Sequence, residues 1–166
     1  NKLEGLGKLE KNFKYKKELI QLLNHKSKDI RVLSIKNLAK LRDIKLLKFF
    51  EKTLKDEHSL ARREGISAIG RLKDKKIIKS LVPFLKDSDP NIVLQSLRAL
   101  EKFKNDKQVL ENISKLKKHK NEQIKKYVRL LTDNNKKLKD DFSNNQYLQN
   151  IVVEADVDNE ALDKVK

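Results

Sequence analysis

Residues 75–103 read KKIIKSLVPFLKDSDPNIVLQSLRALEKF, and this stretch decides the fold. In its first part, apolar residues recur at positions 77, 78, 81, 82 and 85, which is the spacing of one face of a helix. A turn follows in which Asp89 is a favoured N-cap, and Pro90 suits the first turn of a second helix over residues 91–103. The stretch therefore predicts two antiparallel helices joined by a short turn, with Pro83 kinking the first helix.

The same pattern recurs along the chain at a step of 31 residues, which indicates a repeat protein. The apolar columns at that step are Leu23, Leu54, Leu85 and Leu116; Ile35, Ile66, Leu97 and Val128; Leu38, Ile69, Leu100 and Leu131; and Leu41, Leu72 and Phe103. A small residue recurs at Ser34, Gly65 and Ser96 and is replaced by Tyr127. The helix pairs predicted from this register are 13–24 with 30–41, 44–55 with 60–72, 75–86 with 91–103, and 107–117 with 122–131. Residues 3–9 resemble the end of a further second helix.

Short motifs give the repeat a family resemblance. Two first helices end in LKD at 54–56 and 85–87, one second helix begins with DPNI at 89–92, and another ends in SAIGRLKD at 67–74. These features resemble the HEAT repeat family, in particular its short HEAT-like variant, over residues 3–133. The resemblance implies an all-α fold, a right-handed α-solenoid of helix pairs that serves as a scaffold or recognition surface. An armadillo repeat would need a third helix, for which a unit of 31 residues has no room.

The composition predicts a soluble and strongly basic protein. The chain has no Cys, which excludes disulfides and thiolate metal sites. No apolar run is long enough to cross a bilayer and no signal-peptide core is present, so we expect a cytoplasmic location and no membrane partner. Lys and Arg number 40 against 24 Asp and Glu, and the excess lies in residues 1–139 because residues 140–166 are acidic. The formal charge of +16 favours a polyanionic partner, nucleic acid first and acidic protein second.

Cations recur at the same step on the second helices, the row of helices that lines the concave surface of a HEAT stack. One column is Lys36, Ser67, Arg98 and Arg129, and another, one turn further along the helix, is Lys40, Arg71, Lys102 and Asp133. We define the basic stripe as the six cations of these columns: Lys36, Lys40, Arg71, Arg98, Lys102 and Arg129. Packed helices lie about 10 Å apart, so cations on successive repeats can follow a phosphate backbone. The stripe is the candidate nucleic-acid-binding site, and a merely solvated Lys-rich face is the alternative.

Other chemistry finds little support in the sequence. Base readout needs side chains delivered into a groove or stacking aromatics, and the chain has no Trp, with most Phe and Tyr in apolar columns. We interpret His25, His58 and His119 as exposed turn residues. No HExxH motif, Gly-rich phosphate loop or Ser/His/Asp arrangement occurs, so no catalytic residue, metal site or cofactor is predicted. A HEAT-like DNA glycosylase is disfavoured by the lack of Trp, and a metal-dependent HEAT hydroxylase by the lack of His-Glu pairs.

The register fails after Leu131, and residues 134–166 are predicted to form a linker and the start of a truncated α/β domain. Residues 150–156 (NIVVEAD) are strand-like and residues 159–166 (NEALDKVK) helical. They are similar to the opening of amino-type DNA methyltransferase domains, although the Pro-Pro loop and methyl-donor Gly motif of that family do not occur in this sequence. The sequence thus predicts a non-catalytic HEAT-like module that engages DNA through phosphates and is linked to a DNA methyltransferase. A scaffold for an acidic protein is the alternative.

Overall fold

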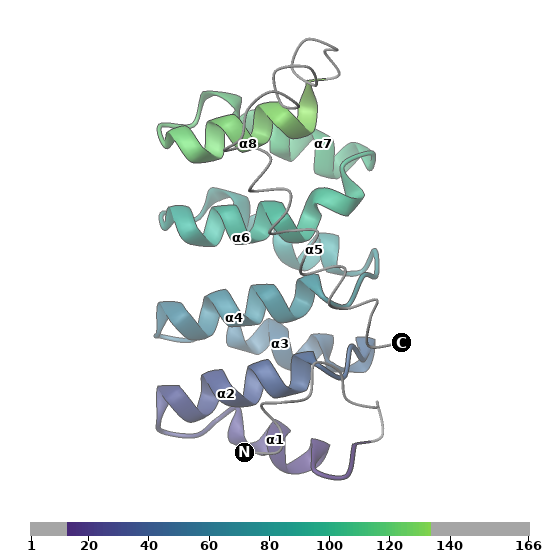
Figure 1. The fold of residues 1–166 in the computed structure, drawn as a ribbon, viewed down its shortest axis with the longest axis vertical. Coiled ribbons are helices and arrows are strands. Elements are labelled where there is room, and N and C mark those ends of the chain that lie inside the picture. Colours follow the sequence, from purple (N-terminus) through teal and green to yellow (C-terminus); the bar gives the residue numbers. More distant parts are fainter. Residues whose placement is uncertain (1–12, 134–166) are drawn as a thin grey trace, which may run out of the picture. The chain divides into compact units, whose positions relative to one another are not determined.

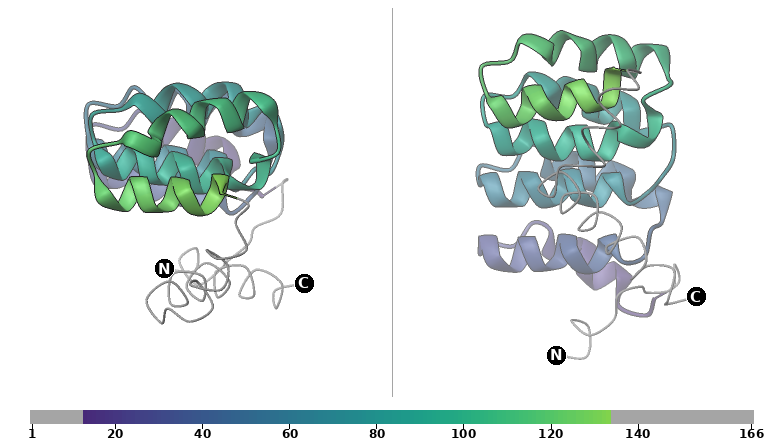
Figure 2. Two further views of the ribbon diagram at one scale, coloured as in Figure 1. Left: turned by 90° about the horizontal axis from the view of Figure 1, so that it is seen from above. Right: turned by 45° about the horizontal axis from the view of Figure 1, so that its top comes forward.

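The computed structural model describes residues 13–133, and the chain divides into two compact units, Asn1–Leu131 and Thr132–Lys166. In the described part of the first unit, helices pair in chain order and form two layers, with α2, α4, α6 and α8 in one and their partners in the other (Figure 1 and Figure 2). The α-helices are α1 (Lys16–Leu22), α2 (Lys28–Ala39), α3 (Leu47–Thr53), α4 (Ser59–Gly70), α5 (Ile77–Leu81), α6 (Pro90–Leu100), α7 (Lys107–Ser114) and α8 (Glu122–Thr132). Short 3₁₀ helices extend them: η1 (Ile44–Leu46), η2 (Val82–Lys86), η3 (Glu101–Phe103) and η4 (Lys115–Lys118).

No strand occurs between residues 13 and 133, so the predicted all-α solenoid is confirmed. Each predicted helix pair is present, with boundaries displaced by a few residues. The predictions for residues 3–9 and 134–166, including the strand at 150–156, lie outside the described residues. The predicted domain boundary after residue 133 stays a prediction.

The first helix of the third repeat changes character at its proline. It is α-helical as α5 and becomes the 3₁₀ helix η2 at Val82, with Pro83 in the first turn of η2. Because proline has no N–H to donate, it cannot continue the α-helical bonding pattern. The kink predicted at Pro83 therefore takes the form of a tighter 3₁₀ turn. Since α7 makes the same change into η4 at Lys115 without a proline, a proline is not required for it.

Polar side chains cap the N-terminal ends of several helices, including the one predicted from the sequence. The side chain of Asp89 accepts a hydrogen bond from the backbone N–H of Asn91 at 2.9 Å, which confirms Asp89 as the N-cap of α6. Asp106 caps α7 in the same way, accepting from the N–H groups of Gln108 and Val109. Such caps fix where each turn ends, and so they set the register in which the next helix packs.

The apolar columns form the core between the layers. The column Ile35, Ile66, Leu97 and Val128 is buried throughout, and no member is more than 1% exposed. In the first-helix column, Leu54, Leu85 and Leu116 are buried, as predicted. The prediction is wrong for Leu23, which is only partly buried because it lines a groove between the first and second repeats. The second helices of successive repeats pack along the stack, α2 on α4 and α4 on α6, and this packing places their exposed faces in one row.

Candidate nucleic-acid interface

The six residues of the basic stripe lie on the layer of second helices, α2, α4, α6 and α8, or directly after their last turns (Figure 1). Five of them are exposed: Lys36, Arg71, Arg98, Lys102 and Arg129. Lys40 is partly buried. The structure separates the six into two groups, because Lys36, Arg98 and Arg129 project from the bodies of helices, whereas Lys40, Arg71 and Lys102 lie at or after helix C-terminal ends.

Two of the members on the helix bodies, Lys36 and Arg98, interact with side chains of the next repeat. The ammonium of Lys36 on α2 lies 3.9 Å from the carboxylate of Glu64 on α4. Arg98 on α6 lies near a second pair, in which the Tyr127 hydroxyl donates to Glu101 at 2.6 Å. Burial, together with this hydrogen bond, raises the pKa of Tyr127, and the charge of Arg98 opposes the rise. Glu64 therefore partly neutralises the charge of Lys36.

The members at helix ends have a structural reason to be cationic. Lys40 and Arg71 are the C-cap residues of α2 and α4, where carbonyl groups without helical partners and the helix dipole favour positive charge. The ammonium of Lys102 donates a hydrogen bond to the backbone carbonyl of Gly70, the last residue of α4, at 2.5 Å. This bond joins the third repeat to the second. Part of the charge that the sequence assigned to a ligand therefore stabilises helix ends.

Two cations that the sequence reasoning missed lie beside this group. Arg42 and Lys73 follow the ends of α2 and α4, and each has a left-handed backbone, with φ of 48° and 51°. Glycine or asparagine is usual at such a position, since a Cβ is strained there. We define the helix-end cluster as Arg42, Arg71, Lys73 and Lys102. A signal was present in the sequence, because Arg42, Lys73 and Lys104 form a further column of cations at the 31-residue step.

The charges of the helix-end cluster act on one another. Burial and the neighbouring charge of Arg71 lower the pKa of Arg42. Burial, followed by the charges of Lys73 and Arg42, lowers the pKa of Lys102 to about 8, even though much of the Lys102 side chain is solvent-exposed. The nearby carboxylate of Asp43 is already engaged, since it accepts a 2.6 Å ion pair from Lys16 and a hydrogen bond from the N–H of Lys45. The cluster therefore concentrates positive charge at one place on the surface.

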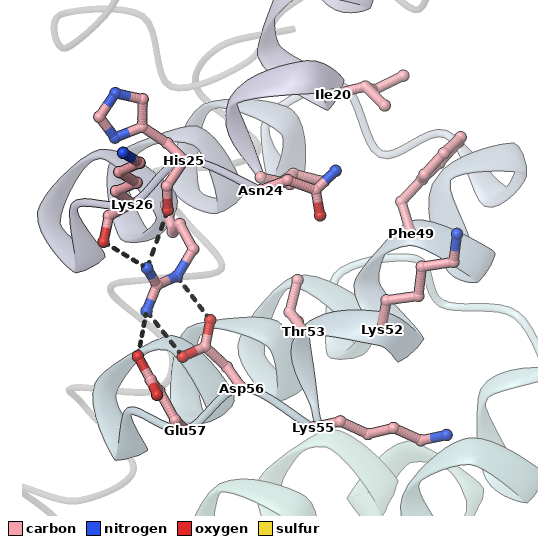
Figure 3. A pocket seen from close by; sticks show the side chains of 12 residues that line it. Ile20, Asn24, His25, Lys26, Phe49, Lys52, Thr53, Lys55, Asp56 and Glu57 are labelled. Atoms are coloured by element: carbon pink, nitrogen blue, oxygen red, sulfur yellow. Dashed lines mark hydrogen bonds and ion pairs between the residues drawn. The ribbon is translucent and has the colours of Figure 1, made fainter.

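A groove of ≈ 540 Å³ opens between the first and second repeats at the turns that join each helix pair (Figure 3). Arg31 binds Asp56 across it with two bonds of 2.8 and 3.0 Å, and also donates to the carbonyls of His25 and Lys26. Desolvation acts to raise the pKa of Asp56, but hydrogen bonds from Arg31 and from the N–H of His58 outweigh it and the pKa is lowered. Because these polar groups satisfy one another, the groove is a joint between repeats and we do not regard it as a ligand site.

The three histidines lie in the turns between paired helices, as predicted. The ring Nδ1 atoms of His25, His58 and His119 accept hydrogen bonds from the backbone N–H two residues ahead, so each histidine stabilises its turn. His25 is exposed, as predicted, whereas the prediction of exposure is wrong for His58 and His119, which are partly buried. Within residues 13–133 no three His, Cys, Asp or Glu side chains come together in a way that could hold a metal ion.

Paired helices, stacked in sequence order, define a repeat-based binding module. A family model for HEAT repeats matches residues 46–132, which is more than half of the chain. The chain therefore belongs to the HEAT repeat family, and the resemblance found in the sequence is confirmed for the repeats. No curated protein matches it. None of the helices in the described part is long and apolar enough to span a membrane.

Proposed function

We propose that this module binds duplex DNA through phosphate contacts along the basic stripe. The observation that carries the proposal is the recurrence of exposed cations on, or directly after, the second helices α2, α4, α6 and α8, in a chain with a formal charge of +16. Packed helices lie about 10 Å apart, a spacing at which side chains on successive repeats can contact phosphates along a strand. Neutralising phosphates releases condensed counterions, and this release supplies affinity without a base sequence.

The face offers little for reading bases. Aromatic side chains in the described residues go mostly into the core or against it, as Phe50 does on α3 and Phe84 on η2. Tyr127, which lies on the layer of second helices, is largely buried and donates its hydroxyl to Glu101. Stacking on the bases of single strands needs exposed aromatic rings, and this face offers few of them. The proposal is therefore binding directed by phosphates and duplex shape, with weak sequence preference.

The test compares two charge reversals of equal size on opposite layers. Arg98→Glu/Arg129→Glu changes two exposed cations of the stripe, and Lys79→Glu/Lys86→Glu changes two exposed cations on α5 and η2. Fluorescence anisotropy with labelled duplexes of two unrelated sequences gives the affinity at several salt concentrations. Four to six phosphate contacts predict a log–log slope of roughly −4 to −5 for the unmodified protein.

The stripe variant should lose affinity equally for both duplexes and give a slope shallower by about 2, because two phosphate contacts are lost. The variant on α5 and η2 should keep the slope of the unmodified protein. Equal losses of affinity in the two variants would show that the positive charge attracts DNA over the whole surface, and the stripe would then not be a binding site.

A scaffold that holds an acidic protein is the second candidate, and family membership favours it because HEAT repeats mostly serve as protein-interaction surfaces. Both candidates depend on salt, so competition separates them better. Unlabelled duplex should displace labelled duplex at far lower concentration than an acidic peptide of equal charge. The reverse order would favour the scaffold.

The link to a DNA methyltransferase stays a prediction, since it depends on residues 150–166, which lie outside the described part. It combines the loose match of that segment with the basic character of the repeats. A Pro-Pro-Tyr motif encoded shortly after Lys166 would support the link. A coding sequence that lacks such a motif would remove it and leave the DNA-binding proposal intact.

A further inference from the structure

The helix-end cluster contains an arginine, Arg42, two of whose guanidinium nitrogens have no hydrogen-bond partner in the described part of the protein. The Nε and Nη2 atoms of Arg42 are buried and have no hydrogen-bond partner there. A buried polar group without a partner is costly, and a charged one more so, which is why such groups are rare in folded proteins. The position of Arg42 is therefore not explained by bonds within the repeats.

The backbone at the cluster is also costly. Arg42 and Lys73 both adopt positive φ, which L-residues other than Asn and Asp seldom do. A glycine at either position would relieve this strain and still end the helix. The third member of the column, Lys104, has an ordinary φ of −58°. Two long cations are thus held in strained conformations at the same position of successive repeats.

Nearby acids do not balance the charge. Asp43 is paired with Lys16, and the side chain of Asp74 accepts a hydrogen bond from the N–H of Lys76. Lys102 uses one of its three ammonium donors on the Gly70 carbonyl, which leaves two for another acceptor. Buried donors, strained backbone and converging cations together describe a surface arranged around an anion that comes from outside the repeats.

We propose that the helix-end cluster is an oxyanion site that binds a phosphate group. The guanidinium of Arg42 carries paired N–H donors in a plane, which suits two oxygens of one phosphate, and the ammonium of Lys102 supplies a point charge beside them. Four cations suit the successive phosphates of a nucleic-acid backbone, each with one negative charge, better than an isolated carboxylate. The assignment to a backbone phosphate of DNA rests on the function proposed above. On that assignment, the helix-end cluster is the tightest phosphate contact along the basic stripe.

The test follows Lys102 by NMR in the full chain, with lysines labelled by reductive carbon-13 methylation and the Lys102 signal identified by its loss in Lys102→Arg. The signal should titrate near pH 8 in the free protein. Pyrophosphate should raise this midpoint by about 1 pH unit, because an adjacent anion favours the charged amine. Pyrophosphate is the probe because it carries the proposed chemistry without a nucleic-acid strand.

Arg42→Gln supplies the variant and Lys104→Gln the matched control. Arg42→Gln should raise the midpoint of free Lys102, since one repelling charge is gone, and should abolish the response to pyrophosphate. Lys104→Gln removes an equal charge from the next position of the same column. The midpoint of free Lys102 and its response to pyrophosphate should both stay as in the unmodified protein. Arg42→Lys, which keeps the charge but loses the fork of donors, should restore the low midpoint and only part of the response.

A pyrophosphate response at Lys102 that disappears in Arg42→Gln supports the site, even if DNA fails to bind and the proposed function falls. Weaker DNA binding by Arg42→Gln than by Lys104→Gln supports the assignment to a backbone phosphate. An ordinary lysine midpoint in the free protein, or equal shifts at all lysine signals, would overturn the site even if DNA binds tightly.

Discussion

Gly65 on α4 packs closely against Thr53 and Leu54 of the preceding first helix, and replacing it tests this packing. A Cβ at Gly65 would lie 2.0 Å from Thr53 Oγ1, 3.2 Å from Thr53 Cβ and 3.3 Å from Leu54 Cδ2. Thr53 and Leu54 are each 6% exposed, so neither side chain can relieve the clash by moving out into solvent. Ser34 and Ser96 occupy the same position in the neighbouring repeats, and each carries a Cβ there. Among these three repeats, only the second therefore has an approach too close for a Cβ.

Two opposing effects set the magnitude for Gly65→Ala. Overpacking a well-filled core costs about 1 to 3 kcal/mol, and the 2.0 Å contact places this site at about 2 to 3 kcal/mol. Replacing a helical glycine by alanine gains about 1 kcal/mol, so we expect a net loss of about 1 to 2 kcal/mol. Thr53→Ala removes the atom at 2.0 Å, at a cost of about 1 kcal/mol for the hydrogen bond from its hydroxyl to the Phe50 carbonyl. The double variant should therefore be at least as stable as Thr53→Ala alone.

The assay is urea unfolding followed by far-UV circular dichroism, with the slope m required to stay constant so that the free energies of unfolding can be compared. Ser96→Ala is the control, since that position already holds a Cβ, and it should change stability by less than about 1 kcal/mol. A Gly65→Ala protein as stable as the unmodified one would refute the reasoning. So would a double-mutant cycle without coupling between the two positions, because contacting residues must couple if the clash is real.

Three further predictions concern other contacts. Leu85→Ala should cost about 2 to 5 kcal/mol in urea unfolding, the range for deleting a large buried side chain, and a cost below 1 kcal/mol would contradict its place in the core. Asp56→Asn should cost about 1 to 3 kcal/mol of unfolding free energy near neutral pH. Because the folded pKa of Asp56 is lowered, the stability difference between the two proteins should disappear as the pH falls below about 4. A difference that stays constant with pH would show that the carboxylate charge is not its cause. The folded pKa of Tyr127 is raised, so unfolding releases a proton from its hydroxyl above about pH 10, and the stability of the unmodified protein should fall there. Tyr127→Phe lacks this hydroxyl and should lose less stability over the same pH range. Thermal melts at several pH values measure the difference.

The fold was predictable because the determinants are local and repeated. The 31-residue step places Ile66 and Leu97 at the same buried position, and capping residues such as Asp89 mark where helices begin. The failures have physical reasons as well. Burial at Leu23 depends on a neighbouring repeat rather than on the residue itself, and no local pattern separates an α-helical turn from the 3₁₀ turn that begins at Lys115.

The candidate site was predictable only in part, because exposure follows from helix periodicity whereas interaction partners do not. Periodicity placed Arg98 and Arg129 correctly on the exposed face. It could not show that Glu64 approaches Lys36 from the next repeat, or that Lys102 reaches the Gly70 carbonyl. Helix periodicity also missed Arg42, because residues after the last helical turn fall outside a helical pattern. The 31-residue column of cations that contains Arg42 was nevertheless present in the sequence.

Net charge is a weak guide to where a basic solenoid binds, and the helix ends show why. Each second helix ends in carbonyl groups that favour a cation, so a stack of repeats gathers Lys and Arg there whether or not a ligand exists. Lys40, Arg71 and Lys102 all have this explanation. Arg42 does not, because its buried Nε and Nη2 find no carbonyl or carboxylate among the described residues. Positive charge that the fold does not use for itself is the part that points to a ligand, and within the described repeats that criterion selects Arg42 ahead of the more exposed cations of the stripe.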